Sequence, residues 1–507
     1  MPPPNEKLAA ALDELRRLQD DGTRIFRSSD LTRTSRERLL KHGFLREVMR
    51  GWLMSSSPQT RPGDTTPWFA TFWEFCRRYS EDAFGAAWHL SPEQSLLLHA
   101  ENTTVPRQVI LHSPGAHNHL VDLPFGTSFF ALREKAMPPP RDLEVVRGLR
   151  VYDVAAALVR ASGDFFTSHP IETRIVLGGV RDPSPLLTRL LEGGHAIVAG
   201  RLAAVFRRHG RGEIADEIVA AMRAADHDVR ERDPLAGAVV HAALPPSTPP
   251  IAARLQAMWS AARDAVLAEL PRTKAIPDRG AYLHAIDDVY KLDAYHSLSI
   301  EGYRVTPELV ARVASGDWDP DGIPADRDNR DALAAHGYWL AFQRVRDTVA
   351  RILETGDRRI VRTAHRAWYR ELFGPFVSAG LLTPAMLGGY RNAPVYLRGS
   401  RHVPPRSEVL GDAMSALFDL VEQEPHAGVA AVLAHWLVGY VHPFPDGNGR
   451  IARFVMNALF AAAGSPWTVI RVDERDAYLA ALETASVGND ARPFARFVAA
   501  QMRRRRS

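Results

Sequence analysis

The segment 442–453, with the sequence HPFPDGNGRIAR, constrains the fold of this chain more than any other stretch. The residues before it, 427–441, form the most apolar run of the chain, which is too short for a membrane span. That run predicts a buried helix, and the prolines after its terminal histidine predict a short loop. Gly447 and Gly449 then begin a new helix and allow a ligand to approach the backbone closely. The segment therefore predicts a helix–loop–helix unit.

The second helix of this unit is suited to bind an anion. The first turn of a helix points unpaired N–H groups outward, and Arg450 and Arg453 share one helix face. Two guanidinium groups can hold the oxygens of a polyphosphate, and Asp446 offers the carboxylate that Mg²⁺ prefers. A histidine side chain ordinarily titrates near neutral pH, which makes His442 the candidate general base. Each residue alone has an ordinary structural interpretation, but their occurrence within one short segment favours chemistry.

The segment resembles the signature of Fic-domain proteins, H-x-F-x-[D/E]-G-N-G-R-x-x-R, at every specified position. The resemblance covers about 279–498 and implies a helical domain with a small β-hairpin flap that transfers AMP from ATP to a protein hydroxyl. It implies that His442 is the catalytic base and that Asp446 binds Mg²⁺. The residues implied to bind the nucleotide are Gly447, Asn448, Gly449, Arg450 and Arg453. The residues implied to form the flap and dock the target protein are Val395, Tyr396 and Leu397.

A second match lies upstream, where Ser297, Glu301 and Gly302 occur in the sequence SLSIEG. Taken alone, a serine and a glutamate at a helix end are an ordinary cap and an exposed acid. The sequence nevertheless fits the inhibitory motif [S/T]-x-x-x-E-[G/N] of Fic-domain proteins. The resemblance implies that Glu301 pairs with Arg453 and occupies the site of the γ-phosphate, while Ser297 fixes the inhibitory helix.

The chain divides at a stretch rich in proline, residues 242–250, which predicts a stiff linker. We expect a winged-helix domain over 1–60, formed by three helices and a hairpin, and an α+β region over 61–241. Strand-like runs occur in that region at 108–112, 119–123 and 128–132. The remainder, 251–507, is expected to be the helical Fic domain with its inhibitory helix. The predicted fold class is thus mainly α.

The small net charge of +4 is concentrated near the N-terminus. Residues 22–54 carry eight basic and three acidic side chains, which predicts a surface for an anionic partner. A winged helix there would use it for DNA, although such a helix face is often only solvated. The candidate DNA-binding residues are Arg33, Arg36, Arg38, Lys41, Arg46 and Arg50. The first half also resembles, weakly, the AbiEi-type antitoxins of bacterial toxin–antitoxin systems.

Three further expectations concern location, partners and metals. One cysteine, Cys76, and no apolar core near the N-terminus predict a cytoplasmic protein without a membrane partner. Expected partners are a protein with a Ser, Thr or Tyr hydroxyl, DNA, and a second copy of this chain. His112, His117 and His119 lie close in sequence, but only Asp122 stands near them as a carboxylate, so a metal site is not favoured.

The predicted function is that of an autoinhibited protein adenylyltransferase that uses ATP and Mg²⁺. Two alternatives stay open from the sequence. One is a DNA-binding, antitoxin-like transcriptional regulator whose Fic domain only senses nucleotide. The other is an enzyme whose same site transfers a different nucleotidyl group or removes one.

Overall fold

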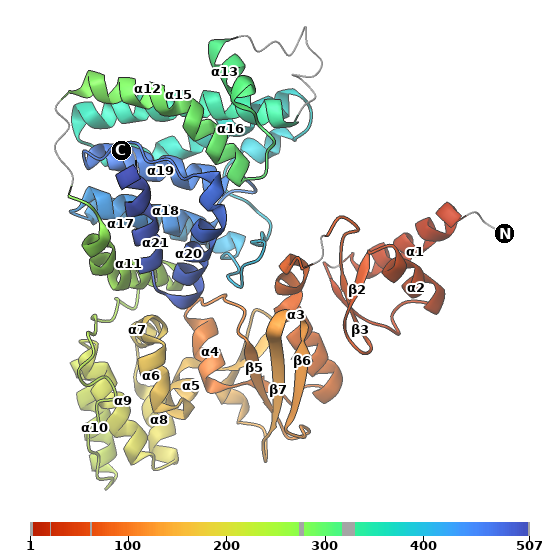
Figure 1. Cartoon of the computed structure of the whole chain (residues 1–507). Helices are drawn as coiled ribbons and strands as arrows, with labels where there is room; N and C mark the ends of the chain where they lie inside the picture. Colours follow the sequence, from red (N-terminus) through yellow and green to blue (C-terminus); the bar gives the residue numbers. More distant parts are fainter. Residues whose placement is uncertain (1–3, 21, 61–62, 273–277, 317–329, 505–507) are drawn as a thin grey trace. The chain divides into compact units, whose positions relative to one another are not determined.

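The computed structural model describes residues 4–20, 22–60, 63–272, 278–316 and 330–504 (Figure 1). The chain forms two compact units. Unit 1 comprises Met1–Pro250 and Tyr396–Val403, and unit 2 comprises Ile251–Val395 and Pro404–Ser507. The chain is mainly helical, as predicted, and the strands all lie in unit 1 among the described residues.

Unit 1 begins with two helices and a three-stranded antiparallel sheet. Their bounds are α1 (Pro4–Leu18), β1 (Ile25–Arg27), α2 (Arg33–Lys41), β2 (Leu45–Met49) and β3 (Trp52–Ser55), and the sheet order is β1-β3-β2. Thr32 caps α2, because its hydroxyl accepts the Ser35 N–H at 3.4 Å. The predicted order of three helices is wrong at the second helix. Residues 28–31 form a turn, in which Asp30 accepts the Arg27 N–H at 2.8 Å.

A four-stranded sheet and helix α3 (Thr66–Phe84) follow. The strands are β4 (His89–Leu90), β5 (Gln108–Ser113), β6 (His119–Leu123) and β7 (Thr127–Arg133), in the order β4-β5-β7-β6. The three strand-like runs of the sequence are confirmed as β5, β6 and β7. Strands β5 and β7 run parallel, while the other neighbouring pairs are antiparallel.

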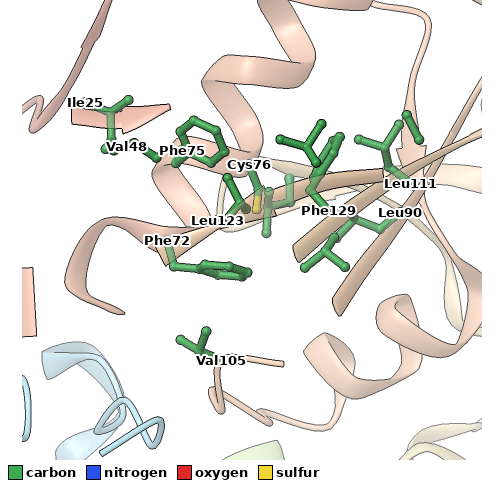
Figure 2. Packing of buried hydrophobic residues seen from close by; sticks show 14 of the residues in the cluster. Ile25, Val48, Phe72, Phe75, Cys76, Leu90, Val105, Leu111, Leu123 and Phe129 are labelled. Atoms are coloured by element: carbon green, nitrogen blue, oxygen red, sulfur yellow. The ribbon is translucent and has the colours of Figure 1, made fainter. Parts of the chain in front are cut away.

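Aromatic side chains of α3 form the centre of the core of this region (Figure 2). Phe72 and Phe75 are fully buried with Leu111 and Phe129 of the sheet. Burial of each such side chain contributes about 1.5–3 kcal/mol. The same core includes Ile25, Val48 and Trp52 of the first sheet. Other N-terminal residues, among them Leu15 and Leu39, form a separate hydrophobic cluster.

The rest of unit 1 is a hairpin, a group of short helices and the segment Tyr396–Val403. The elements are β8 (Leu143–Val146), β9 (Leu149–Tyr152), α4 (Pro92–His99), α5 (Val154–Arg160), α6 (Gly163–Ser168), α7 (Pro170–Gly179), α8 (Ser184–Glu192), α9 (Ala196–Arg208) and α10 (Gly212–Ala224). The Val105 N–H donates to the Arg401 carbonyl at 2.8 Å, and the Gly399 N–H donates to the Thr65 hydroxyl at 3.1 Å.

Unit 2 is helical. Its helices are α11 (Pro250–Glu269), α12 (Arg279–Ile300), α13 (Pro307–Ser315), α15 (Arg330–Thr355), α16 (Val361–Ser378), α17 (Leu410–Gln423), α18 (Ala427–Val441), α19 (Asn448–Ala462), α20 (Arg475–Gly488) and α21 (Arg492–Arg504). Helix α18 is buried on almost every side, which explains why its sequence is apolar throughout. Among the residues that the structure describes, no helix is long and apolar enough to cross a membrane.

Candidate active site

The backbone at His442 ends helix α18. Its φ and ψ of 50° and 59° are left-handed, which is uncommon for a residue other than glycine. Arg391, which is 4% exposed, holds this turn: its N–H donates to the Pro443 carbonyl at 2.9 Å, and its Nε donates to the His442 carbonyl at 2.8 Å. Nothing in the sequence pointed to Arg391, because it lies 51 residues before the histidine that it holds.

The His442 side chain is partly buried, and its chemistry follows from one contact. Nδ1 lies 3.2 Å from the Gly439 carbonyl oxygen, which can only accept a hydrogen bond. Nδ1 therefore carries the proton, and the lone pair is on Nε2. Burial lowers the pKa of His442 to about 4, against the opposing effect of Glu301. The imidazole is thus neutral at pH 7 and able to accept a proton.

The loop between the two helices is fixed by Phe444 and Asn448. Phe444 is buried and stacks on Tyr369 with ring centroids 4.1 Å apart. The Asn448 amide accepts the Phe444 N–H and donates to the Phe444 carbonyl, both at 2.8 Å. Asn448 is 1% exposed, and its side chain is already committed to the loop. Its side chain therefore braces the loop, which leaves its backbone at the first turn of α19 for contact with an anion.

Two glycines bring the start of α19 close to other groups. Gly447 has a φ of 75°, and a Cβ there would lie 2.7 Å from the ring of Phe373. A Cβ on Gly449 would lie only 2.3 Å from Oε1 of Glu301. Only hydrogen fits at either position, so the glycines allow an anionic group to sit against the first turn of the helix.

Arg450 lies in this site without a hydrogen-bond partner among the described residues. It is fully buried between the rings of Tyr303 and Phe373, whose centroids are 5.2 and 5.0 Å from its Cζ. The Asp446 carboxylate is 3.7 Å away and accepts the Gly447 N–H at 2.6 Å. A buried guanidinium without hydrogen bonds is costly. Arg450 is therefore arranged to receive an anion.

Arg453 by contrast is occupied. Its Nη2 donates to Oε1 of Glu301 at 2.7 Å and to the Ser297 carbonyl at 3.1 Å, and its Nε donates to the Ser297 hydroxyl at 2.8 Å. Helix α12 ends where these groups meet, since Glu301 is its C-cap and Gly302 follows with a φ of 90°. The Arg475 guanidinium also donates to the Ile300 carbonyl at 2.9 Å, which holds this last turn.

The charge of Glu301 is stabilised by its surroundings. Burial raises the pKa of this carboxyl, but the positive charges of Arg453 and Arg450 outweigh burial and hold the pKa below its ordinary value. The carboxylate thus stays ionised and lies against Gly449 at the start of α19. It fills the position that the helix N-terminus and the two arginines would offer to another anion.

A cavity of about 280 Å³ adjoins Asp446 and Tyr303. Its lining residues are Tyr303, Arg330, Phe373, Phe376, Leu381, Leu382 and Asp446. The lining is mostly apolar with a few charged groups, which is the usual composition of a small-molecule site. Tyr303, Phe373 and Arg391 are site residues that no sequence motif marked.

The predicted flap does not form a hairpin. Residues 388–405 are all described and contain no strand, and Val395, Tyr396 and Leu397 are irregular backbone. Tyr396 and Leu397 belong to unit 1, whereas Val395 belongs to unit 2. Further along the segment, the carbonyl groups of Arg401 and Val403 accept hydrogen bonds from Val105 and Thr103.

The candidate DNA-binding residues fall into two groups. Arg36, Arg38 and Arg46 donate to the carbonyl groups of Ser28, Lys7 and Thr60 at 2.8, 3.0 and 2.9 Å, so they hold the fold together. The remaining three point to solvent, and one of them is paired. Arg33 forms an exposed ion pair with Glu37 at 2.9 Å, while Lys41 and Arg50 are exposed.

Comparison with known proteins finds relatives for much of unit 2. Residues 357–460 match the model of the Fic/DOC family. The chain is 34% identical over 224 residues to the protein adenylyltransferase Fic of Nematostella vectensis, and the aligned region covers 42% of this chain and 47% of the relative. It is 30% identical over 223 residues to the protein adenylyltransferase Fic of Drosophila willistoni, which covers 43% of this chain and 41% of the relative.

The chain therefore spans less than half the length of these curated relatives. Among solved structures, Fic-1 of C. elegans is 20% identical with a TM-score of 0.38, over 66% of this chain and 96% of that chain. The Fic domain that the sequence predicted is supported over 357–460. The matches reported above do not show the winged-helix and antitoxin resemblance of the first half.

Proposed function

We propose that unit 2 is an autoinhibited protein adenylyltransferase, which transfers AMP from ATP to a Ser, Thr or Tyr hydroxyl of a target protein or of itself. One observation carries this proposal. The start of α19 and Arg453 form an anion site that is filled by the chain's own Glu301, while the neighbouring Arg450 has no hydrogen-bond partner among the described residues. A neutral imidazole with a free Nε2 lies at the end of the preceding helix.

In the proposed reaction, Nε2 of His442 accepts the proton of the target hydroxyl. The hydroxyl oxygen forms a bond to the α-phosphorus, the bond to the bridging oxygen breaks, and pyrophosphate leaves. The backbone N–H groups of Gly449 and its neighbours, together with Arg450 and Arg453, would hold the phosphate oxygens and stabilise the charge that develops on them. A regulator that only senses nucleotide would not need the neutral imidazole.

Mg²⁺ fits the residues at this site. Asp446 is a carboxylate with 54% of its side chain exposed at the start of α19, close to where the phosphates would lie. A carboxylate with phosphate oxygens is the ligand set that Mg²⁺ prefers. Asp446 would hold the ion, which would supply charge neutralisation of the phosphates.

The pair of Glu301 and Arg453 explains the proposed inhibition. A carboxylate at 2.7 Å from Arg453 and against Gly449 leaves no room there for the terminal phosphate of a nucleotide. The Arg453 side chain is 3% exposed and the Glu301 side chain 26%. Breaking a fully buried pair from one side costs about 3–5 kcal/mol, and this partly exposed pair costs less. The pair can therefore hold ATP in an unproductive position or keep it out. Ser297 strengthens the contact by binding Arg453 twice.

The test is AMP transfer by the Glu301→Gly variant with ATP labelled at the α-phosphate, followed by mass spectrometry of the protein and of added lysate. We expect a rise in transfer of about 100-fold, because release of the carboxylate frees Arg453. The same substitution at Glu308, an exposed carboxylate in the first turn of α13, is the control and should change nothing. Equal activity of wild type and Glu301→Gly would refute the inhibition. No AMP adduct with either protein would refute the enzyme.

A second candidate function belongs to the N-terminal residues. Helix α2 precedes the β2–β3 hairpin as in the expected winged helix, although residues 28–31 form a turn where a helix was expected. Lys41 and Arg50 are exposed cations in this part. We infer that this part binds DNA through phosphate contacts. Affinity for duplex DNA should fall steeply as salt rises. Affinity that is absent or insensitive to salt contradicts the DNA proposal.

The cytoplasmic location and a homodimer stay predictions.

A further inference from the structure

Three side chains of unit 1 converge at one end of its four-stranded sheet. His89 in β4 stands directly opposite His112 in β5, so the two side chains lie on the same face. Glu134 follows the last residue of β7, and its N–H donates to the Ser113 carbonyl of β5 at 3.1 Å. Three neighbouring strands thus each supply one group to the same place, although the residues are far apart in sequence.

The side chains of this cluster point at one another. Nε2 of His89 is 2.7 Å from Oε2 of Glu134, and Nδ1 of His112 is 3.8 Å from the same oxygen. All three atoms lie within 4.8 Å of one another. The two imidazole rings are stacked, with centroids 5.3 Å apart. His89 is fully buried, whereas the side chains of His112 and Glu134 are 18% and 32% exposed.

The hydrogen bonds determine what can lie between these atoms. Nδ1 of His89 is 3.0 Å from the Leu90 carbonyl, which only accepts, so Nδ1 carries a proton. In the neutral ring, the lone pair on Nε2 then faces a carboxylate oxygen at 2.7 Å. Two electron pairs in contact require a positive centre between them, either a proton or a metal ion. A proton shared between His89 and Glu134 would not explain why the His112 side chain also lies close to the same oxygen.

A metal ion accounts for all three groups. Bonds from zinc to nitrogen and oxygen of about 2.0–2.1 Å place tetrahedral ligands about 3.3 Å apart, between the two observed separations. The hydrogen bond from Nδ1 of His89 to a backbone carbonyl is the usual support of a metal-binding histidine. Two imidazoles with a carboxylate suit a first-row transition metal, whereas Mg²⁺ and Ca²⁺ prefer oxygen ligands only.

We propose that His89, His112 and Glu134 bind one divalent transition-metal ion, for which zinc is the probe, with water in the remaining position. Three protein ligands would leave the fourth position to water, and two of them, His112 and Glu134, are partly exposed. The sequence interpretation considered His112 with His117 and His119 instead. The strand order β4-β5-β7-β6 separates β6, and with it His119, from β5 and brings His89 to His112.

The test is zinc binding by the full chain after removal of metals with a chelator, measured by calorimetry and by the change in melting temperature. Glu134→Gln and His112→Gln keep the side-chain volume close to that of the original. Loss of a metal ligand should weaken zinc binding by at least about 100-fold, more than loss of a supporting contact. His119→Gln, an exposed histidine of the same sheet, is the matched control and should bind zinc as the wild type does.

Two outcomes would overturn the proposal. Equal zinc affinity of wild type and Glu134→Gln would show that the cluster is an imidazolium–carboxylate pair and that zinc binds elsewhere. No rise in the melting temperature of the wild type with zinc would show that the cluster does not bind zinc. If a variant fails to fold, X-ray absorption of the zinc-loaded wild type decides instead. Two imidazole ligands with one carboxylate support the site, and any other ligand set refutes it.

Discussion

The start of α19 in unit 2 and the end of the sheet in unit 1 are two buried polar sites of opposite character. In unit 2, guanidinium groups and helix N–H groups converge, and Arg450 has no hydrogen-bond partner among the described residues. In unit 1, Nε2 of His89 lies 2.7 Å from Oε2 of Glu134, which requires a proton or a metal ion between the two atoms. Because unsatisfied buried groups are expensive, each site calls for a ligand of the missing charge. The first requires an anion, and the second requires a cation.

The two sites also differ in how the protein manages that requirement. In unit 2 the chain supplies its own anion, Glu301, at the end of a helix that precedes the site by about 150 residues, as the pairing of Glu301 with Arg453 shows. In unit 1, Glu134 pairs only with His89 and His112 among the described residues. An internal ligand permits regulation, because it can be displaced, whereas a site without one depends on the supply of its ion.

The largest expected effect tests the chemistry of the anion site. His442→Ala, made in the Glu301→Gly background, should lower AMP transfer by about 10³-fold or more, because positioned proton acceptance contributes about 10²–10⁴-fold and the imidazole also shapes the loop. Transfer is measured with labelled ATP, and circular dichroism shows whether the fold is kept. Transfer at the level of the Glu301→Gly parent would mean that another group accepts the proton.

The next prediction compares both sites in one set of variants. Glu301→Gly should raise AMP transfer by about 100-fold and leave zinc affinity unchanged, whereas Glu134→Gln should lower zinc affinity by about 100-fold and leave AMP transfer unchanged. Each protein is assayed for both properties. A change of both properties by either substitution would show that the two sites are coupled and do not act independently.

Arg391 should matter for catalysis although it lies outside every sequence motif. Its guanidinium and N–H hold the carbonyl groups of His442 and Pro443. Arg391→Ala in the Glu301→Gly background should lower kcat by about 10–100-fold and change KM for ATP little, since misplacing the base by about 1 Å has a cost of that size. A loss confined to KM would make Arg391 a nucleotide-binding residue instead.

Arg450 should bind ligand at the expense of stability. Replacement by Met removes a buried charge that has no hydrogen bonds among the described residues, so Arg450→Met should raise the free energy of unfolding by about 1 kcal/mol while ATP binding is lost. Urea unfolding with and without ATP measures both quantities. A clear loss of stability would mean that the contacts with Tyr303 and Phe373 outweigh the burial of charge.

The smallest expected effect is that of pH on the rate of AMP transfer. Burial holds the pKa of His442 at about 4, so the neutral base persists well below the ordinary pKa of histidine, 6.5. Removal of Glu301, whose charge raises that pKa, lowers it further. Transfer by Glu301→Gly should therefore change less than about twofold between pH 8 and pH 6. A fall centred near pH 6.5 would show that the imidazole is solvated during the reaction.

The anion site could be predicted from sequence because most of its groups lie in one segment, where helix periodicity fixes the geometry. His442, Asp446 and the two arginines fall on adjacent turns of a single helix–loop–helix. The contact from Arg391, and the rings of Tyr303 and Phe373 around Arg450, come from other elements and have no local pattern. The side-chain contacts of Asn448 also depend on packing that the motif does not encode.

The cation site shows the same limit more strongly. His89 and Glu134 are separated by 45 residues, and only strand order and register bring them together. His112 and His119, which are close in sequence, lie on strands that are separated because β7 lies between β5 and β6. The second of the three expected helices is instead a turn at 28–31, because Ser and Asp favour helix starts and turns alike.

The close approach of Glu301 to Gly449 makes occupancy of α19 by carboxylate and by phosphate mutually exclusive. With clearance for a single hydrogen atom, no intermediate arrangement can hold both groups. In the proposed enzyme, ATP would bind productively only to the fraction of molecules in which the end of α12 has moved away, and its apparent dissociation constant would be the intrinsic one divided by that fraction. A partner that favours the open state would then raise the apparent affinity for ATP without contacting the nucleotide.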